Sequence, residues 1–154
     1  MDIQKLLKTG HAKKSKKKII VFKDKKNPQT LYFDNSKIFE VIEVVVDSGL
    51  IKSEQEQCKC DFFLYVSDPN YEESREHYIE LKGTDLDHAI KQISETIKFL
   101  ENNYSLNLQN KRKGYIICNK CPMASTQTQR FQLKMRKDFK LELKIQSRKY
   151  TATI

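Results

Sequence analysis

Apolar and polar residues alternate along this chain in a way that predicts short strands separated by helices. A strand repeats every two residues, whereas a helix returns to the same face every three to four residues. Strands are predicted at 19–22, 30–33, 60–66, 77–82, 114–118 and 140–146. Helices are predicted at 2–8, from a cap at Thr84 or Asp85 to residue 102 or 103, and at 124–137. The expected fold class is α/β, a mixed β-sheet flanked by helices.

The helix after residue 84 has the strongest signal in the sequence. Its apolar residues recur at three- and four-residue spacing, at Leu86, Ala89, Ile90, Ile93, Ile97 and Leu100. Residues 36–46 are ambiguous by the same test, because Ile38, Phe39 and Ile42 fit a helical stripe. The β-branched run at 44–46, which leads into a turn at 47–49, favours a strand for 41–46.

The remaining segments suggest one domain over 1–154. The strands at 19–22 and 30–33 flank a turn signalled by Asn27-Pro28, which predicts a basic β-hairpin. We expect an N-terminal basic extension at 1–35, a core at 36–118, and a C-terminal helix and strand at 119–154. Residues 104–112 are predicted to be a loop, and the tail at 148–150 is expected to fray.

Charge is distributed unevenly over the 154 residues, whose formal net charge is +9. Residues 1–30 hold ten Lys/Arg and two Asp/Glu, residues 34–101 hold seven and sixteen, and residues 102–154 hold twelve and two. Basic flanks suit a polyanion, and an acidic centre suits a hard cation with oxygen ligands. The alternative is that these charges only solvate the protein.

Several classes of protein are disfavoured by composition. No apolar run approaches the roughly 20 residues needed to cross a membrane, and the lysine-rich N-terminus does not look like a secretion signal. The four cysteines, Cys58, Cys60, Cys118 and Cys121, are too few for a disulfide scaffold. We therefore expect reduced thiols in a cytoplasmic protein. A zinc site built from the two cysteine pairs is the alternative.

Three charged residues are expected to share one small patch. Glu80 and Lys82 are two residues apart near the end of one predicted strand, so they lie on the same face. Asp61 begins the preceding strand and lies beside Glu80 if the two strands pair as a hairpin. Mg²⁺ usually takes one or two carboxylates and keeps several waters. Asp61 and Glu80, joined by the Leu81 carbonyl oxygen, are the expected ligands.

This arrangement resembles the PD-(D/E)XK nuclease superfamily. The resemblance lies in Asp61, in Glu80-Leu81-Lys82 nineteen residues later, and in the amphipathic helix that follows. It implies a restriction-endonuclease-like core over about residues 41–118 and Mg²⁺-dependent hydrolysis of phosphodiester bonds, with Mn²⁺ as a substitute. Lys82 would act on water or phosphate. Gln92 matches a position where several such families place a supporting polar residue.

Such nucleases often add an acid from a helix before the sheet. Here that helix holds only Asp2, and Glu40, Glu43 and Asp47 are the candidates to replace it. A binding module with a degenerate site is therefore the alternative function. A further alternative is that Asp61, Glu80 and Lys82 are a surface ion-pair cluster, which contributes little to stability.

Nucleic acid is the expected partner, with DNA favoured over RNA and no membrane involved. The basic segments 13–26 and 111–140 are predicted to bind the phosphate backbone. The individual candidates are Lys13, Lys14, Lys16, Lys17, Lys18, Lys111, Arg112 and Lys113. A homodimer is also expected if both strands of a duplex are cut, since that requires two sites.

Overall fold

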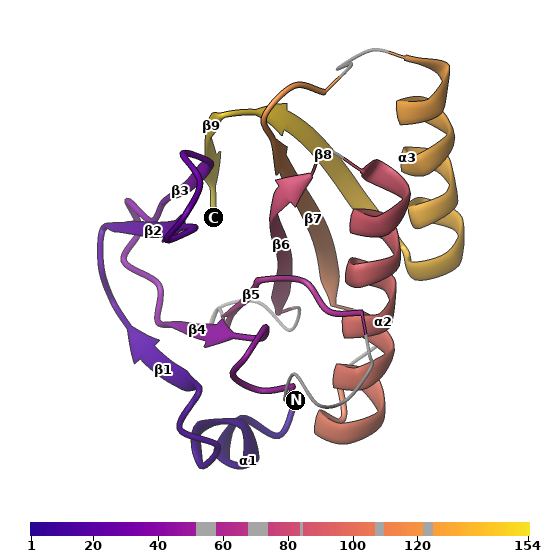
Figure 1. Ribbon diagram of the computed structural model, residues 1–154. Helices are drawn as coiled ribbons and strands as arrows, with labels where there is room; N and C mark the ends of the chain where they lie inside the picture. The colour runs from indigo at the N-terminus through magenta and orange to yellow at the C-terminus, as the bar shows by residue number, and fades with distance from the viewer. Residues whose placement is uncertain (52–57, 68–73, 84, 107–109, 122–124) are drawn as a thin grey trace.

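The computed structural model describes residues 1–51, 58–67, 74–83, 85–106, 110–121 and 125–154, with only the backbone of residues 82 and 83. Three helices and nine strands are found in this part of the chain (Figure 1). In chain order they are α1 (Ile3–Leu7), β1 (Ala12–Ser15), β2 (Ile19–Lys23), β3 (Thr30–Asp34), β4 (Val41–Val45), β5 (Phe62–Val66), β6 (Arg75–Gly83), α2 (Leu86–Tyr104), β7 (Lys111–Cys118), α3 (Thr126–Phe139), β8 (Leu141–Ser147) and β9 (Lys149–Thr153).

Six strands form the main sheet, in the order β1-β4-β5-β6-β7-β8. The first four are antiparallel to their neighbours, whereas β7 and β8 run parallel to β6. Each parallel step needs a crossover, which α2 and α3 provide. Figure 1 shows both helices on one side of this sheet. The expected mixed α/β arrangement is confirmed at this level.

Helix α2 covers the main sheet with the apolar stripe that the sequence predicted. Its Asp85 N-cap accepts a hydrogen bond from the backbone N–H of His88 at 3.1 Å. All six predicted stripe positions are buried against the sheet, at Leu86, Ala89, Ile90, Ile93, Ile97 and Leu100. The Asp85 cap marks the start of α2, which begins three residues after the end of β6.

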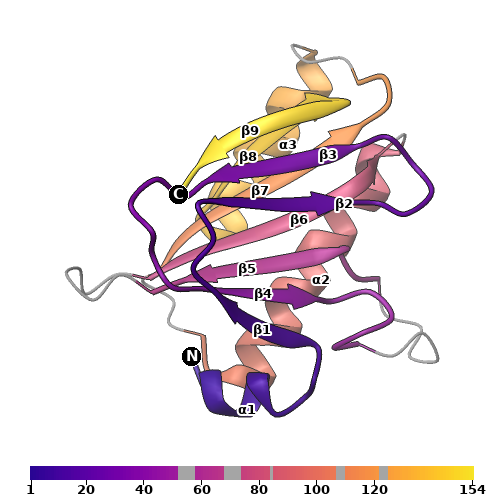
Figure 2. The ribbon, with the colours of Figure 1, turned by 90° about the vertical axis from the view of Figure 1, so that its left-hand side faces the viewer.

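A second, three-stranded sheet covers the opposite face of the main sheet (Figures 1 and 2). Its order is β2-β3-β9, with β2 and β3 forming the predicted antiparallel hairpin and β9 parallel to β3. Phe22 and Phe33 from this sheet pack with Leu64 and Ile79 of the main sheet in one hydrophobic cluster. The second face is thus covered by a sheet, and not by the helices that the sequence led us to expect.

Two further expectations are corrected by the structure, and one strand is found that the sequence did not predict. The tail predicted to fray forms β9, because Thr30–Asp34 supplies a pairing partner from the other end of the chain. The loop predicted at 104–112 ends earlier, since β7 begins at Lys111. The basic run at 12–18 contains β1, which pairs with β4 at the edge of the main sheet. Within the described residues, no helix combines the length and apolar character needed to cross a membrane.

Candidate functional site

Asp61 and Glu80 come together where β5 begins and β6 ends. The two strands are antiparallel with Phe62 opposite Ile79, so the next position of the register joins Asp61 to Glu80. The Asp61 carboxylate oxygen Oδ2 accepts a hydrogen bond from the backbone N–H of Leu81 at 2.8 Å. Asp61 is half-buried. Its side chain therefore continues the ladder between the strands beyond the last backbone pair.

Glu80 lies on the helix side of the main sheet and is only 2% exposed. It is two residues from Tyr78, which packs in the hydrophobic cluster under α2. The two carboxylates both affect the pKa of the buried Cys60 thiol. The pKa of Cys60 is raised to about 12, chiefly by burial. A hydrogen bond with Thr96 opposes this rise, and the negative charges of Glu80 and then Asp61 contribute to it. Both carboxylates therefore act on one small volume.

Helix α2 holds the backbone that precedes Asp61. Gln92 Nε2 donates a hydrogen bond to the carbonyl oxygen of Lys59 at 2.8 Å. One turn later, Thr96 Oγ1 accepts from the N–H of Cys60 at 3.0 Å and donates to the Gln92 carbonyl at 2.9 Å. Gln92 thus contacts the segment that carries Asp61. Thr96 makes the second contact with this segment. Thr96 was not identified from the sequence, which shows only a polar residue among the buried positions of the helix.

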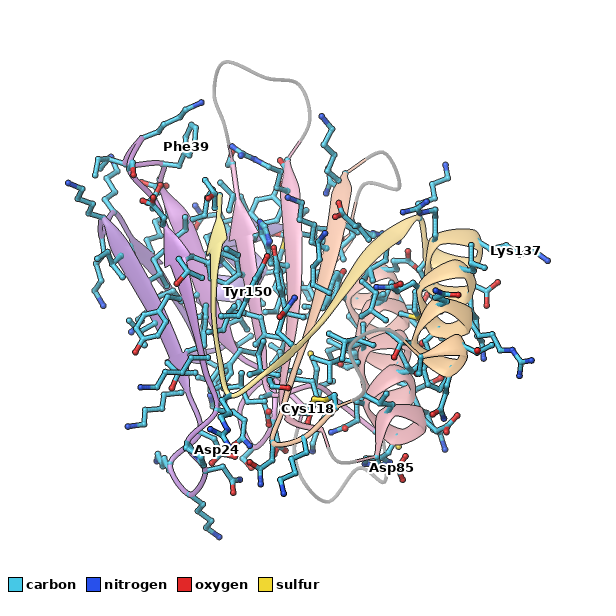
Figure 3. All side chains as sticks on the ribbon, turned by 90° about the horizontal axis from the view of Figure 1, so that it is seen from above. Asp24, Phe39, Asp85, Cys118, Lys137 and Tyr150 are labelled. Carbon is cyan, nitrogen blue, oxygen red and sulfur yellow. A yellow bond between two sulfur atoms is a disulfide. The ribbon has the colours of Figure 1, made fainter. Side chains whose placement is uncertain are left out.

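The other two members of the predicted motif follow Glu80 directly. The Leu81 side chain is fully buried on the opposite face of the sheet, in the cluster between the two sheets. Lys82 is in β6, but its side chain lies outside the described residues. The pairing of β6 with β7 becomes irregular between Glu80 and Gly83. Figure 3 shows Asp85, at the start of α2, on the same edge of the molecule as Cys118 at the end of β7.

The three candidate early acids lie on or near β4, each beside a lysine. Glu40 Oε1 is 2.9 Å from Lys14 Nζ, and this hydrogen bond lowers the pKa of Glu40. Glu43 Oε2 is 3.3 Å from Lys13 Nζ. Asp47 follows β4, and its Oδ1 is 3.6 Å from Lys59 Nζ. Glu43 and Asp47 line the same cavity as Asp61, whereas Glu40 does not.

This cavity has a volume of about 800 Å³ and lies at the end of the main sheet where β4 finishes and β5 begins. Its other wall is the tip of the β2–β3 hairpin, and Gly10 to Lys13 contribute a third side. The hairpin tip places three lysines, Lys23, Lys25 and Lys26, around the same space as Asp61. They form a basic run within the predicted segment 13–26. The sequence did not place this run beside Asp61, because only the packing of the two sheets brings the hairpin tip there.

The lysines singled out from the sequence do not gather at one place. Lys13, Lys14, Lys16, Lys17 and Lys18 are exposed, and Lys13 alone among them lines the cavity. Lys111 is exposed and Lys113 half-buried at the start of β7, where Lys111 pairs with Arg75. That end of the sheet is opposite to the end that carries Asp61.

Arg112 requires a correction. It is only 5% exposed, and its guanidinium is paired with Glu76 at 2.9 Å and Glu101 at 2.8 Å. Its side chain faces inward under α2, so a surface contact with phosphate is wrong for this residue. The helix α3, by contrast, presents exposed cations within the predicted segment 111–140, at Arg130, Lys134, Arg136, Lys137 and Lys140 just beyond its end.

Cys118 and Cys121 lie next to each other at the end of β7 and just after it, with Cα atoms 6.0 Å apart, while Cys58 and Cys60 are free. The reduced state of the four cysteines stays a prediction. Across the residues that the structure describes, no group of three or more His, Cys, Asp or Glu side chains is arranged to hold a metal ion. The cytoplasmic setting stays a prediction.

Comparisons with protein-family models, with curated proteins and with solved structures each found no match for this chain.

Proposed function

We propose that this protein is a Mg²⁺-dependent nuclease that hydrolyses phosphodiester bonds, with DNA favoured as its substrate. One observation carries the proposal. The hydrogen bond from the Leu81 N–H to Asp61 brings the first acid of the motif against the strand position that follows Glu80. Two acids that are nineteen residues apart in sequence are thereby neighbours at the end of one sheet.

The topology around these residues supports the same proposal. Three antiparallel strands, β4, β5 and β6, are followed by the crossover helix α2 and then by β7 parallel to β6. This order supports the restriction-endonuclease-like core that the sequence resemblance implies. Ligands of open α/β sheets bind outside the carboxyl ends of parallel strands, and β6 and β7 both end at the edge where Glu80 lies.

The donor set fits Mg²⁺. This ion takes oxygen ligands at about 2.0–2.1 Å, needs only one or two carboxylates, and completes its shell with water. Asp61 and Glu80 would supply the carboxylates, and the Leu81 carbonyl oxygen would join them. The described residues contain no group of three or more His, Cys, Asp or Glu side chains arranged to hold a metal ion, and a site with two carboxylates does not require one. When bound, the ion makes a water more acidic and polarises the phosphate.

Each protein group then has a separate task. Asp61 and Glu80 hold the cation, and Lys82 supplies a positive charge that orients the attacking water or stabilises the phosphate oxygens. Gln92 is a positioning residue, because it binds the Lys59 carbonyl two residues before Asp61. A phosphodiester is hydrolysed when water adds to phosphorus, the P–O bond to one sugar breaks, and that sugar oxygen gains a proton.

The test incubates the full chain with plasmid, linear and single-stranded DNA and with RNA, in the presence of Mg²⁺ or Mn²⁺. The variants are Asp61→Asn, which keeps an oxygen that can accept the Leu81 N–H, and Lys82→Ala. The matched control is Asp87→Asn, which alters an exposed carboxylate on α2. We expect cleavage by the wild type and by the control, and a loss of roughly a hundredfold or more in both site variants. A wild-type protein that cuts none of these substrates refutes the proposal.

A second candidate function is a binding module with a degenerate site. The burial of Glu80 at 2% exposure favours it, because a ligand must reach that carboxylate from the α2 side or from the end of the sheet. So does α1, which carries no acidic residue between its first and last positions. Binding of DNA without cleavage under either metal ion, unchanged in Asp61→Asn, would establish this function.

A further inference from the structure

The cavity next to Asp61 has two walls of different character. One wall is the end of the main sheet, formed by β4, Asp61 and Phe62. The other is the tip of the β2–β3 hairpin, which Figure 2 shows lying across the main sheet. Figure 3 labels Asp24 at this tip, on the same edge of the molecule as Cys118 and Asp85. The hairpin therefore overhangs the end of the sheet where β6 finishes.

We propose that this cavity admits a single strand of nucleic acid, and that Lys23, Lys25 and Lys26 bind its phosphates across from Asp61. The proposal rests on the proposed nuclease function for the role of Asp61. It goes beyond that function by naming the form of the substrate and the residues of the hairpin that hold it.

Charge supports phosphate binding at the hairpin tip. The acids on the sheet side of the cavity have lysines of their own, since Glu43 contacts Lys13 at 3.3 Å and Asp47 contacts Lys59 at 3.6 Å. The three tip lysines are exposed, and within the described part of the chain none of them forms an ion pair. Their positive charge is therefore available to a polyanion that enters the cavity.

The apolar lining supports a single strand. Val21 and Val45 line the cavity and are 48% and 45% exposed, which makes them two of the five large hydrophobic side chains exposed in the described residues. The faces of unpaired bases are open to such contacts, whereas stacking hides them in a duplex. Grooves for single-stranded nucleic acid combine cations with aromatic side chains on which bases stack, and the half-buried Phe62 lines this cavity beside the two valines.

The size of the cavity favours the same substrate. A volume of about 800 Å³ is that of a pocket for a small ligand, for which the usual range is roughly 300–1,000 Å³. A pocket of this size has room for a nucleotide of a single strand, whose base can turn aside, and not for both strands of a duplex. A protein acting on one strand also needs only one site.

The experiment measures binding in EDTA, so that the result does not depend on cleavage. The probe is a fluorescein-labelled single-stranded DNA of twelve nucleotides, compared with a duplex of the same length, by anisotropy over a salt series. The test variant is the triple substitution Lys23→Gln, Lys25→Gln and Lys26→Gln. The control removes the same charge from exposed positions outside the cavity and outside both basic segments, with Lys37→Gln, Lys91→Gln and Lys98→Gln.

We expect the wild type to bind the single strand more tightly than the duplex. The hairpin variant should lose roughly tenfold or more in affinity for the single strand, and its slope of log K against log salt should flatten by up to about 2. The control should change by less than about threefold. Equal losses in both triple variants would show that bulk charge alone is responsible and would overturn the proposal, as would tighter binding of the duplex.

These outcomes are separable from those of the proposed function. If the wild type cuts DNA and the hairpin variant binds the single strand as tightly as the wild type, the nuclease stands and the cavity assignment fails. If the hairpin variant loses binding while the wild type cuts nothing under Mg²⁺ or Mn²⁺, the cavity assignment stands and the nuclease fails.

Discussion

Arg112 lies in a closed polar cluster at the end of the main sheet where β6 and β7 begin. Its Nε is 2.9 Å from Glu76 Oε2, and its Nη1 is 2.8 Å from Glu101 Oε1. Glu76 is fully buried and also accepts hydrogen bonds from Tyr78 at 2.8 Å and from Asn110 at 2.6 Å. Arg112 is thus the only cation among these five residues, and it faces two carboxylates.

The substitution Arg112→Met keeps most of the side-chain length but removes the charge. Tyr78 and Asn110 would still donate to Glu76, yet its carboxylate would remain buried without the cation. Removing one partner of a buried ion pair costs about 3–5 kcal/mol. The whole free energy of unfolding of a domain is about 5–15 kcal/mol, so the loss would be a large share of it.

Urea unfolding followed by far-UV circular dichroism measures this loss. With a slope of about 2 kcal/mol per molar urea, the midpoint should fall by roughly 1.5–2.5 M. Arg130→Met, which changes an exposed arginine on α3, is the control and should shift the midpoint by less than about 0.3 M. A shift equally small in Arg112→Met, at an unchanged slope, would refute the assignment of Arg112 to a stabilising cluster.

Two further predictions concern buried polar side chains. Burial lowers the pKa of His77 to about 3, with contributions from Lys113 and Arg75. In the unfolded chain His77 therefore binds a proton near pH 6.5, whereas in the native protein it stays neutral until about pH 3. The free energy of unfolding consequently falls as the pH is lowered from 6.5 towards 3, by up to about 1.4 kcal/mol per pH unit. His77→Phe should flatten this fall in urea titrations between pH 6.5 and 4.5, and parallel profiles would contradict it. Thr96→Val should lower the free energy of unfolding by roughly 1–3 kcal/mol, because the N–H of Cys60 loses its acceptor. The same substitution should also reduce cleavage, since Thr96 helps to hold the segment that carries Asp61. A variant as stable and as active as the wild type would show that Thr96 does not position this segment.

Local pattern was sufficient to predict the elements whose partners are near in sequence. The stripe of α2 and its Asp85 cap are set within one segment, and the β2–β3 hairpin is set by its turn. Strand β9 was missed because its partner, β3, is more than a hundred residues earlier, so its pairing leaves no local signal. The three-stranded sheet replaces helices on one face of the main sheet for the same reason.

The candidate site divides along the same line. Asp61 and Glu80 could be paired from the sequence because β5 and β6 are consecutive strands, whose register follows from their hairpin. Arg112 was wrongly predicted to bind phosphate because it lies in a basic run. Its partner Glu76 is thirty-six residues earlier, and nothing local in the sequence indicates that the two side chains meet. Alternation alone would have put Arg112 inside, on the side of Ile116, had the strand been started at Lys111.

Charged side chains are buried and paired at one end of the main sheet, and lysines are exposed at the other. Substitutions at the two ends should therefore affect stability and nucleic-acid binding differently. Where β6 and β7 begin, Arg112 and its carboxylates are buried and matched, so a substitution there changes folding. Where these strands end, Asp61 is half-buried beside a cavity whose hairpin lysines, Lys23, Lys25 and Lys26, form no ion pair within the described residues. Such exposed charges add little stability. A loss of binding in the Lys23, Lys25 and Lys26 variant should therefore leave the urea midpoint almost unchanged. A loss of function in Arg112→Met should instead be accompanied by a lower urea midpoint.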